Sequence, residues 1–245
     1  MTAKTVLILG GTSDVGIATA RIYAGKGWRV VLAGRNEAEL ERNTKDLKAR
    51  YTTTDASYFR LDILDVEEFL EERLSPLPDT AICVVGLLGD QLLAQRSATR
   101  TRDILRTNFE GPALVFETLA RQMAQRGGGI LVGVGSVAGD RGRASNYIYG
   151  AAKGGFAIFL SGLRNRLAGT EVRVLTVKPG YIRTRMTASL KLPNLLTAAP
   201  DEVGRAIYRA AEITKRDVIY VRPVWALLMM IVRNIPEKVF KKMKL

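Results

Sequence analysis

Short apolar runs alternate with helix-length segments along nearly the whole chain, and this alternation constrains the fold more than any other feature. Strands are predicted where Val, Ile and Leu cluster, at residues 6–9, 28–33, 56–61, 81–85, 130–134, 172–177 and 218–221. Helices are predicted between them at residues 14–26, 37–50, 66–74, 100–125 and 148–168. Continuous apolar strands are typical of parallel sheets covered on both faces. The sequence therefore predicts a single α/β unit, a doubly wound parallel sheet of about seven strands with helices on both faces.

Two residue counts exclude several kinds of chemistry. The 245 residues contain no histidine and a single cysteine, Cys83. Tetrahedral zinc sites need clusters of these residues, and Ser-His-Asp or Cys-His catalysis needs an imidazole, so we expect neither. A lone cysteine forms no disulfide within the chain, which suits a reducing cytoplasm, and we expect Cys83 to be a small buried hydrophobic residue. Residues 1–4 lead directly into an apolar run without a signal-peptide pattern, so a cytoplasmic location is predicted.

A glycine-rich turn follows the first predicted strand and opens a helix. Residues 9–16 read Leu-Gly-Gly-Thr-Ser-Asp-Val-Gly. Glycines let the backbone approach a pyrophosphate, and a helix N-terminus offers free N–H groups to it. Ligands of doubly wound sheets bind beyond the carboxyl ends of the strands. We therefore expect a nucleotide there, although an unliganded tight turn is the alternative. The candidate cofactor-binding residues are Gly10, Thr12, Ser13, Asp14, Val15 and Gly16.

The ends of the next two strands bear on the choice of nucleotide. NAD-binding folds commonly place an acidic residue after the second strand, and this chain has Gly34 and then Arg35. A guanidinium can pair with a 2′-phosphate, so NADP(H) is predicted in preference to NAD(H); a solvated loop arginine is the alternative. Asp62 and the adjacent Ile63 are candidates for contacting the adenine, with helix capping by Asp62 as the alternative.

A serine, a tyrosine and a lysine form the candidate catalytic set. Ser136 follows the fifth strand, Tyr149 lies 13 positions later, and Lys153 follows Tyr149 by four. Side chains four apart share one helix face, so the ammonium is expected beside the phenol. A nearby positive charge lowers the pKa of a tyrosine, which would make Tyr149 a proton donor or acceptor near neutral pH. Ordinary packing on a helix surface is the alternative.

Together these motifs resemble the short-chain dehydrogenase/reductase family over nearly the whole chain. Besides Ser136 and the Tyr149-x-x-x-Lys153 motif, the resemblance rests on Asn108 and on a Pro-Gly pair after the sixth strand. It implies a Rossmann-like fold, a nicotinamide cofactor and a homodimer or homotetramer. It also implies further cofactor contacts, at Gly86, Pro179, Gly180, Ile182 and Thr184.

The resemblance implies a mechanism and has two departures. Hydride would pass between the nicotinamide and a substrate carbonyl while Tyr149 donates a proton and Ser136 holds the oxygen. Lys153 would lower the pKa of the tyrosine and contact the nicotinamide ribose, and Asn108 would hold a water for proton resupply. Leu9 and Asp14 stand where the family has threonine and the middle glycine of the loop. Residues 83–85 read Cys-Val-Val in place of Asn-Asn-Ala.

The substrate is indicated by a narrower resemblance. Residues 86–90, 136–143 and 183–186 resemble a branch that reduces decaprenylphosphoryl-2-keto-ribose, which implies a polyprenyl-phosphate-linked keto sugar. Reduction of another hydrophobic ketone, or a non-catalytic NADP-binding sensor or scaffold, are the alternatives. For the arginines near the site, a cofactor contact is the alternative for Arg183 or Arg185, and a solvated surface position is the alternative for each. The candidates for binding a substrate phosphate are Arg141, Arg143 and Arg185, with Arg183 beside them.

The last part of the chain is apolar and basic. We expect residues 1–222 to form the catalytic unit and 223–245 a separate tail. The formal net charge is +13, and residues 218–245 contribute six basic side chains against one acidic. The apolar run at 224–232 is too short to span a bilayer, which takes about 20 residues. An interfacial helix on an anionic membrane is predicted, with packing on the sheet or on another subunit as alternatives. Nucleic-acid binding is not predicted, because no aromatic-interleaved basic platform is found.

Overall fold

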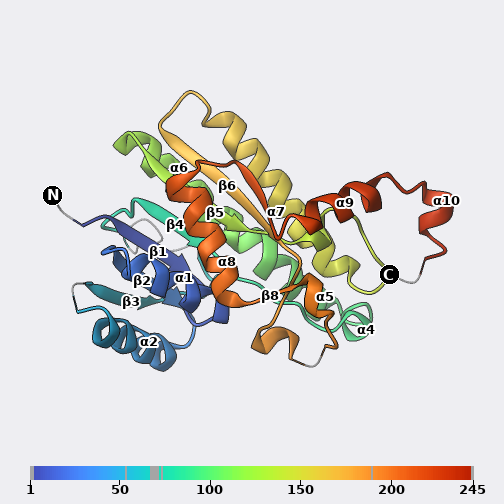
Figure 1. Ribbon diagram of the computed structural model, residues 1–245, viewed down its shortest axis with the longest axis horizontal. Helices are drawn as coiled ribbons and strands as arrows, with labels where there is room; N and C mark the ends of the chain where they lie inside the picture. Colours follow the sequence, from blue (N-terminus) through green and yellow to red (C-terminus); the bar gives the residue numbers. More distant parts are fainter. Residues whose placement is uncertain (1–2, 53, 67–71, 73, 189, 244–245) are drawn as a thin grey trace.

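The computed structural model describes residues 3–52, 54–66, 72, 74–188 and 190–243, and its centre is a parallel sheet (Figure 1). Each of the seven predicted strands forms. They are β1 (Thr5–Leu9), β2 (Arg29–Gly34), β3 (Ala56–Arg60), β4 (Thr80–Cys83), β5 (Gly129–Val134), β6 (Val172–Pro179) and β9 (Val218–Val221). The order is β3-β2-β1-β4-β5-β6-β9, and all neighbouring pairs are parallel. The predicted Rossmann-like sheet is confirmed.

Helices cover both faces of this sheet (Figure 1). Val6 and Ile8 of β1 pack into one apolar core, and Leu7 and Leu9 pack into the other, because successive strand side chains point to opposite faces. This is why the strands are apolar without alternation. One face is covered by α1 (Asp14–Ala24), α2 (Glu37–Arg50) and α8 (Pro200–Tyr208), and the other by α6 (Gly111–Arg126) and α7 (Tyr147–Arg166).

The helix predicted at residues 100–125 is observed as three consecutive helical segments. They are α5 (Ala98–Leu105), a π-helical turn (Arg106–Glu110) and α6. The π turn carries Asn108, and single π turns inside helices are often found at functional sites. Most of the helix predicted at residues 66–74 lies outside the described residues.

Several short elements were not predicted. They are α4 (Gln91–Ala94), a two-stranded sheet of β7 (Tyr181–Ile182) and β8 (Thr197–Ala198), helix α8, and a π turn at Arg209–Ile213. The small sheet lies between β6 and α8 in the chain, so it follows the Pro-Gly pair. Its two-residue strands are too short to produce a recognisable periodicity.

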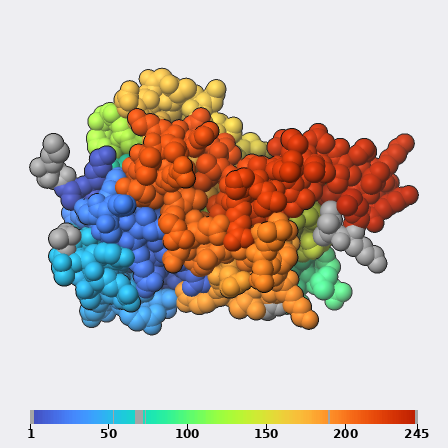
Figure 2. Space-filling view, in the orientation of Figure 1, coloured from blue at the N-terminus to red at the C-terminus, as the bar shows by residue number. Residues whose placement is uncertain are grey.

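The C-terminal arm, residues 223–243, extends from one end of the molecule (Figures 1 and 2). It contains α9 (Val224–Asn234) and α10 (Glu237–Phe240). Trp225 and Met229 are 3% and 1% exposed and pack beside Val137, so one face of α9 is attached to the catalytic unit. Leu228 and Val232 are partly buried against the same cluster, whereas Leu227, Met230 and Ile231 are more than half exposed. Among the described residues, no helix combines the length and the apolar character that crossing a membrane requires.

Candidate active site

A cavity of about 830 Å³ opens at the carboxyl edge of the sheet. Residues that follow four parallel strands converge on it, represented by Ser13 after β1, Val85 after β4, Ser136 after β5 and Pro179 at the end of β6. Its volume is in the range of small-molecule and cofactor sites. The cavity therefore lies where a doubly wound sheet binds its ligand.

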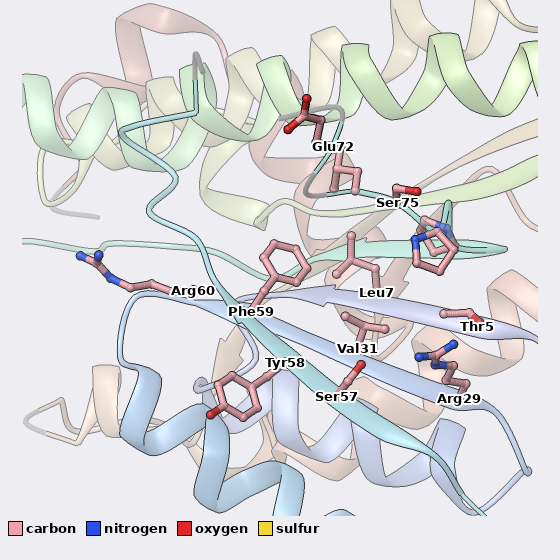
Figure 3. Close-up of a pocket in the computed structure, with 13 residues that line it drawn as sticks. Thr5, Leu7, Arg29, Val31, Ser57, Tyr58, Phe59, Arg60, Glu72 and Ser75 are labelled. Carbon is pink, nitrogen blue, oxygen red and sulfur yellow. The ribbon is translucent and has the colours of Figure 1, made fainter. Parts of the chain in front are cut away.

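A second cavity, of about 360 Å³, lies against β1, β2 and β3 (Figure 3). Leu7 and Phe59 extend from the sheet toward the segment around Ser75, whereas Arg60 points away (Figure 3). The lining of this cavity includes none of the candidate catalytic residues. We therefore assign the chemistry to the larger cavity.

Close helix packing brings Ser136 and Tyr149 together. Ser136 caps a short 3₁₀ turn, where its Oγ accepts a hydrogen bond from the N–H of Ala138 (3.1 Å). A Cβ on Gly150 of α7 would lie 2.7 Å from the carbonyl oxygen of Ala138, so only glycine lets the helix approach so closely. The hydroxyl of Tyr149 shares a hydrogen bond with Ser136. Gly150 is a contributor that the sequence reasoning missed, although its place beside Tyr149 was a signal.

The predicted electrostatics of the Tyr149–Lys153 pair is wrong for this structure. Burial raises the pKa of Tyr149 to about 12, and the hydrogen bond with Ser136 only partly opposes that rise. The ammonium of Lys153 donates instead to the carbonyl oxygens of Val85 (3.0 Å) and Val134 (3.1 Å). Burial lowers the pKa of Lys153 to about 8. Tyr149 and Lys153 line one cavity because they share a helix face. The ammonium, however, points to the backbone carbonyl groups at the ends of two strands, because it donates hydrogen bonds to them.

Asn108 is fully buried beside the lysine. Its Nδ2 donates to the carbonyl oxygens of Leu87 and Ile104 (both 2.8 Å), and its Oδ1 accepts from the N–H of Leu87 (3.1 Å). A Cβ added to Gly86 would lie 3.4 Å from the Asn108 Oδ1 and 3.6 Å from the Lys153 Nζ. Asn108 and Lys153 therefore flank Gly86, and Asn108 fixes the loop that follows β4.

The glycine-rich turn has the geometry that a pyrophosphate needs. Gly10 adopts a φ of +92°, and a Cβ on Gly16 would lie 2.3 Å from the carbonyl oxygen of Gly10. Ser13 caps α1, accepting from the N–H of Gly16 (3.0 Å). The turn thus presents the N-terminus of an 11-residue helix to the cavity, which fits a dinucleotide phosphate. Thr12, Asp14 and Val15 also line the cavity.

The other candidate cofactor residues fall into two groups. Arg35, Asp62 and Ile63 lie outside the cavity lining, and the side chain of Asp62 accepts a hydrogen bond from the N–H of Leu64 (3.0 Å), which forms a local turn. The second group lines the cavity and consists of Gly86, Tyr149, Lys153, Pro179, Gly180, Ile182 and Thr184.

The structure corrects the substrate role predicted for Arg141. Its Nη1 donates to the carbonyl oxygens of Val232 (2.7 Å) and Ile235 (2.6 Å) at the end of α9. Its Nη2 pairs with Glu237 (2.9 Å), and its guanidinium lies over the ring of Phe240. Arg141 therefore anchors the C-terminal arm. Because Arg141 is close to Ser136 in the sequence, we predicted that it lines the cleft. The side chain of Arg141 points to the arm instead.

Arg143 and Arg185 both line the cavity, but their surroundings differ. Arg185 is paired with Asp14 and Glu39 on the cofactor side, so the predicted role in holding a substrate phosphate is not supported. The Nε of Arg143 is buried without a hydrogen-bond partner, which leaves that donor unused. Arg183 is exposed and donates to the Oδ1 of Asn194 (3.0 Å). Arg143 is thus the arginine that the structure retains as a substrate candidate.

Trp225 of the arm forms part of the cavity wall, which the sequence reasoning did not predict. A Cβ on Gly180 would lie 1.9 Å from the indole, so the glycine of the Pro-Gly pair makes room for this ring. The indole N–H donates to the carbonyl oxygen of Leu196 (3.0 Å). The arm thereby contributes to the site, and the predicted boundary at residue 222 separates residues that share one cavity.

Comparison with known proteins agrees with this geometry. Residues 4–194 match the family model described as short chain dehydrogenase. An uncharacterized oxidoreductase of Mycobacterium tuberculosis is 36% identical over 248 residues, covering 98% of this chain and 97% of that protein. The 3-oxoacyl-[acyl-carrier-protein] reductase of Homo sapiens is 31% identical over 201 residues, covering 80% of this chain and 83% of that protein.

A solved structure shows the same fold. A short-chain dehydrogenase from Sphingobium yanoikuyae in complex with NADPH gives a TM-score of 0.80 at 22% identity, covering 96% of this chain and 97% of that chain. The family match extends over most of the chain and includes the residues that line the cavity, apart from Trp225. This chain therefore belongs to the short-chain dehydrogenase/reductase family of oxidoreductases.

Proposed function

We propose that this protein is an NADPH-dependent ketoreductase whose substrate is a phosphate-bearing, lipid-linked keto sugar. The observation that carries the reductase assignment is the meeting of Ser136, Tyr149 and Lys153 at the cavity that the glycine-rich turn also lines. A bound nicotinamide supplies hydride to the carbonyl carbon. The protein must then supply one proton to the carbonyl oxygen.

Tyr149 is the group that donates this proton. Its raised pKa keeps the phenol protonated at neutral pH, which is the form that reduction needs. Ser136 donates a hydrogen bond to the same oxygen as negative charge develops on it. Lys153 donates to two strand-end carbonyl oxygens in the same cavity, and we assign to Asn108 a water that returns the proton through Lys153.

Support for NADP(H) over NAD(H) comes from the end of β2. A Cβ on Gly34 would lie 3.8 Å from the side chain of Thr12, so the exposed Arg35 comes directly after a residue that contacts the cofactor turn. A guanidinium at this place suits a 2′-phosphate. The structure from Sphingobium yanoikuyae binds NADPH, which is consistent with this preference.

Three unpartnered polar atoms support a substrate with hydroxyl and phosphate groups. The Nε2 of Gln91, the Nε of Arg143 and the Oδ1 of Asn146 are buried without a hydrogen-bond partner, and all three residues line the cavity. Leaving such atoms unpaired costs about 1–3 kcal/mol each, so a ligand that satisfies them gains affinity. Two donors and one acceptor complement a sugar that carries a phosphate.

An apolar rim supports the lipid part of the substrate. Leu92 and Leu190 line the cavity and are exposed, and Leu195, 79% exposed, follows Leu190 by five residues. A free sugar gains nothing from such a surface, whereas a polyprenyl chain buries it. This rim supports the proposal that the substrate is of the decaprenylphosphoryl-2-keto-ribose kind.

The exposed side of α9 supports binding to a membrane. Leu227, Met230 and Ile231 are more than half exposed on the arm. The basic residues Arg233, Lys238, Lys241 and Lys242 follow or lie close to them. We propose that the arm lies on the inner, anionic surface of the membrane and presents the cavity to lipid-linked substrate.

The first test measures NADPH oxidation with a polyprenyl-phosphate keto sugar, the corresponding phosphate-free keto sugar and a 3-oxoacyl ketone, each repeated with NADH. We expect the phosphorylated lipid and NADPH to give the highest kcat/KM. Faster reduction of the 3-oxoacyl ketone would favour the second candidate, a reductase of acyl ketones, which the human relative supports. NADPH binding without turnover of any ketone would indicate a sensor or scaffold.

The second test is flotation with vesicles that contain anionic lipid. Replacing Leu227, Met230 and Ile231 together by serine should abolish flotation without unfolding the protein, because these side chains are already exposed. Replacing Ile158 of α7, which is still more exposed, by serine is the control for loss of an exposed apolar side chain outside the arm. Equal flotation of all forms would remove the membrane proposal. A change from homodimer or homotetramer to monomer in the triple variant, measured by light scattering, would identify a second copy as the occupant of this face.

A further inference from the structure

The side chain of Arg185 joins the two sides of the cavity. Its Nε donates to Oδ1 of Asp14 (3.0 Å) and its Nη1 to Oε1 of Glu39 (2.9 Å). Its Nη2 donates to the carbonyl oxygen of Thr12. Its backbone N–H donates to Oδ2 of Asp14 (2.7 Å). These contacts connect parts of the chain that are 146 to 173 residues apart, so they depend entirely on the tertiary structure.

The bridge explains how an aspartate, Asp14, can stand at the expected phosphate site. It is the first residue of α1, at the helix N-terminus that should attract a phosphate. An unpaired carboxylate there would repel the pyrophosphate. Both of its oxygens instead accept hydrogen bonds from Arg185, which neutralises the charge. The aspartate that replaces glycine at position 14 therefore depends on Arg185 for its neutralisation.

The bridge lies between two parts of the expected cofactor site. Thr12, Ser13 and Asp14 line one side of the cavity, and Ile182 and Thr184 line the other. A dinucleotide that contacts both the α1 N-terminus and Thr184 must connect the same two sides that Arg185 joins. The side chain of Arg185 is exposed, whereas Asp14 and Glu39 are partly buried, so opening the bridge moves the arginine into water while the two carboxylates stay at the site.

We propose that Arg185, Asp14 and Glu39 form a latch that controls cofactor exchange. The latch opens when cofactor binds or leaves and is closed between these events. The latch is closed both before and after the cofactor is bound. It therefore slows binding and release of the cofactor to a similar extent and changes the rates rather than the equilibrium affinity. This inference rests on the proposed use of NADP(H).

Stopped-flow NADPH fluorescence with the full-length protein tests the latch without requiring turnover. Arg185→Ala combined with Asp14→Asn opens the latch without leaving an unpaired carboxylate beside the pyrophosphate, so this double variant should raise both the association and the dissociation rate constants about fivefold while Kd stays nearly unchanged. Arg185→Lys keeps the positive charge but loses the two-pronged guanidinium, so it should give an intermediate effect. Arg185→Ala alone should also accelerate exchange, but it should raise Kd because the unpaired Asp14 repels the pyrophosphate.

The matched control is Arg183→Ala, which removes an exposed arginine two positions away that contacts Asn194 rather than the cofactor turn. Its rates should equal those of the wild type. Unchanged rates in Arg185→Ala would overturn the latch and leave the proposed function intact. In the double variant with Asp14→Asn, a rise in the dissociation rate alone, with a matching rise in Kd, would overturn it by making Arg185 a direct cofactor contact. Absence of NADPH binding by the wild type would overturn the proposed function and the latch together.

Discussion

The catalytic cluster and the C-terminal arm are attached to the same short segment, but they are held in different ways. Ser136 begins this segment, and Arg141, five residues later, anchors the arm. The cluster is surrounded by protein: Asn108 is 0% exposed and Lys153 is 3% exposed. Backbone carbonyl groups and close helix contacts fix its side chains.

The arm is attached through one face of α9, where Trp225 and Met229 are buried, and through Arg141, which donates hydrogen bonds to the end of α9. The opposite face of α9 is exposed and apolar. The positions of the buried cluster's side chains therefore depend on the whole fold, whereas the part of the site that the arm contributes depends on a few side chains. The two can therefore be altered separately.

The largest expected effect comes from removing the proton donor. Tyr149→Phe should lower kcat at least about 10²-fold, the usual contribution of a general acid, because only the hydroxyl is lost. NADPH binding and the attachment of the arm should be unchanged. NADPH oxidation and fluorescence titration measure the two properties. Comparable turnover in the variant would show that Tyr149 is not the donor.

The next effect is a pH dependence of stability that belongs to the buried lysine. Burial lowers the pKa of Lys153 to about 8, so between pH 8 and 10 the unfolded chain binds this proton more strongly than the folded chain. Stability should therefore rise with pH by about 2 kcal/mol over this window. Lys153→Met should abolish that rise, as measured by urea unfolding.

In the wild type and in Lys153→Met alike, ionisation of Cys83 and Tyr149 lowers the stability as the pH rises. Burial raises the pKa of Cys83 to about 11 and that of Tyr149 to about 12, so each ionises first in the unfolded chain and lowers stability at high pH. The relevant quantity is the difference between wild type and Lys153→Met. A difference that stays constant from pH 8 to 10 would contradict a depressed pKa for the lysine.

The smallest effect should come from the anchor of the arm. Arg141→Ala removes charge-assisted hydrogen bonds to the end of α9, and bonds of this kind contribute about 1.5–3 kcal/mol. Hydrogen exchange of residues 224–234 should accelerate, and kcat/KM should fall for a lipid-linked ketone but not for a small one. Arg141→Lys should restore part of the protection. Unchanged exchange in Arg141→Ala would show that the buried face of α9 holds the arm without Arg141.

The sheet and the catalytic residues were predictable because their signals are local. Apolar runs such as residues 172–177 mark a strand wherever it lies in the fold, and the spacing of Tyr149 and Lys153 puts both on one helix face. The role of Arg141 was predicted wrongly because its place in the sequence, close to Ser136, says nothing about the direction of its side chain. Trp225 was predicted as part of a tail because the space beside Gly180 is visible only in three dimensions.

The sequence by itself determined the α/β architecture, the family, and the residues that meet at the cavity, because periodicity and short motifs carry that information within a few residues. Only the tertiary structure decided which partners the charged side chains take. Arg141 pairs with the arm, Arg185 with Asp14, and Lys153 with two strand-end carbonyl groups. The physical reason is that hydrogen bonds and burial act over a few ångströms, between residues that the folded chain brings together from distant positions.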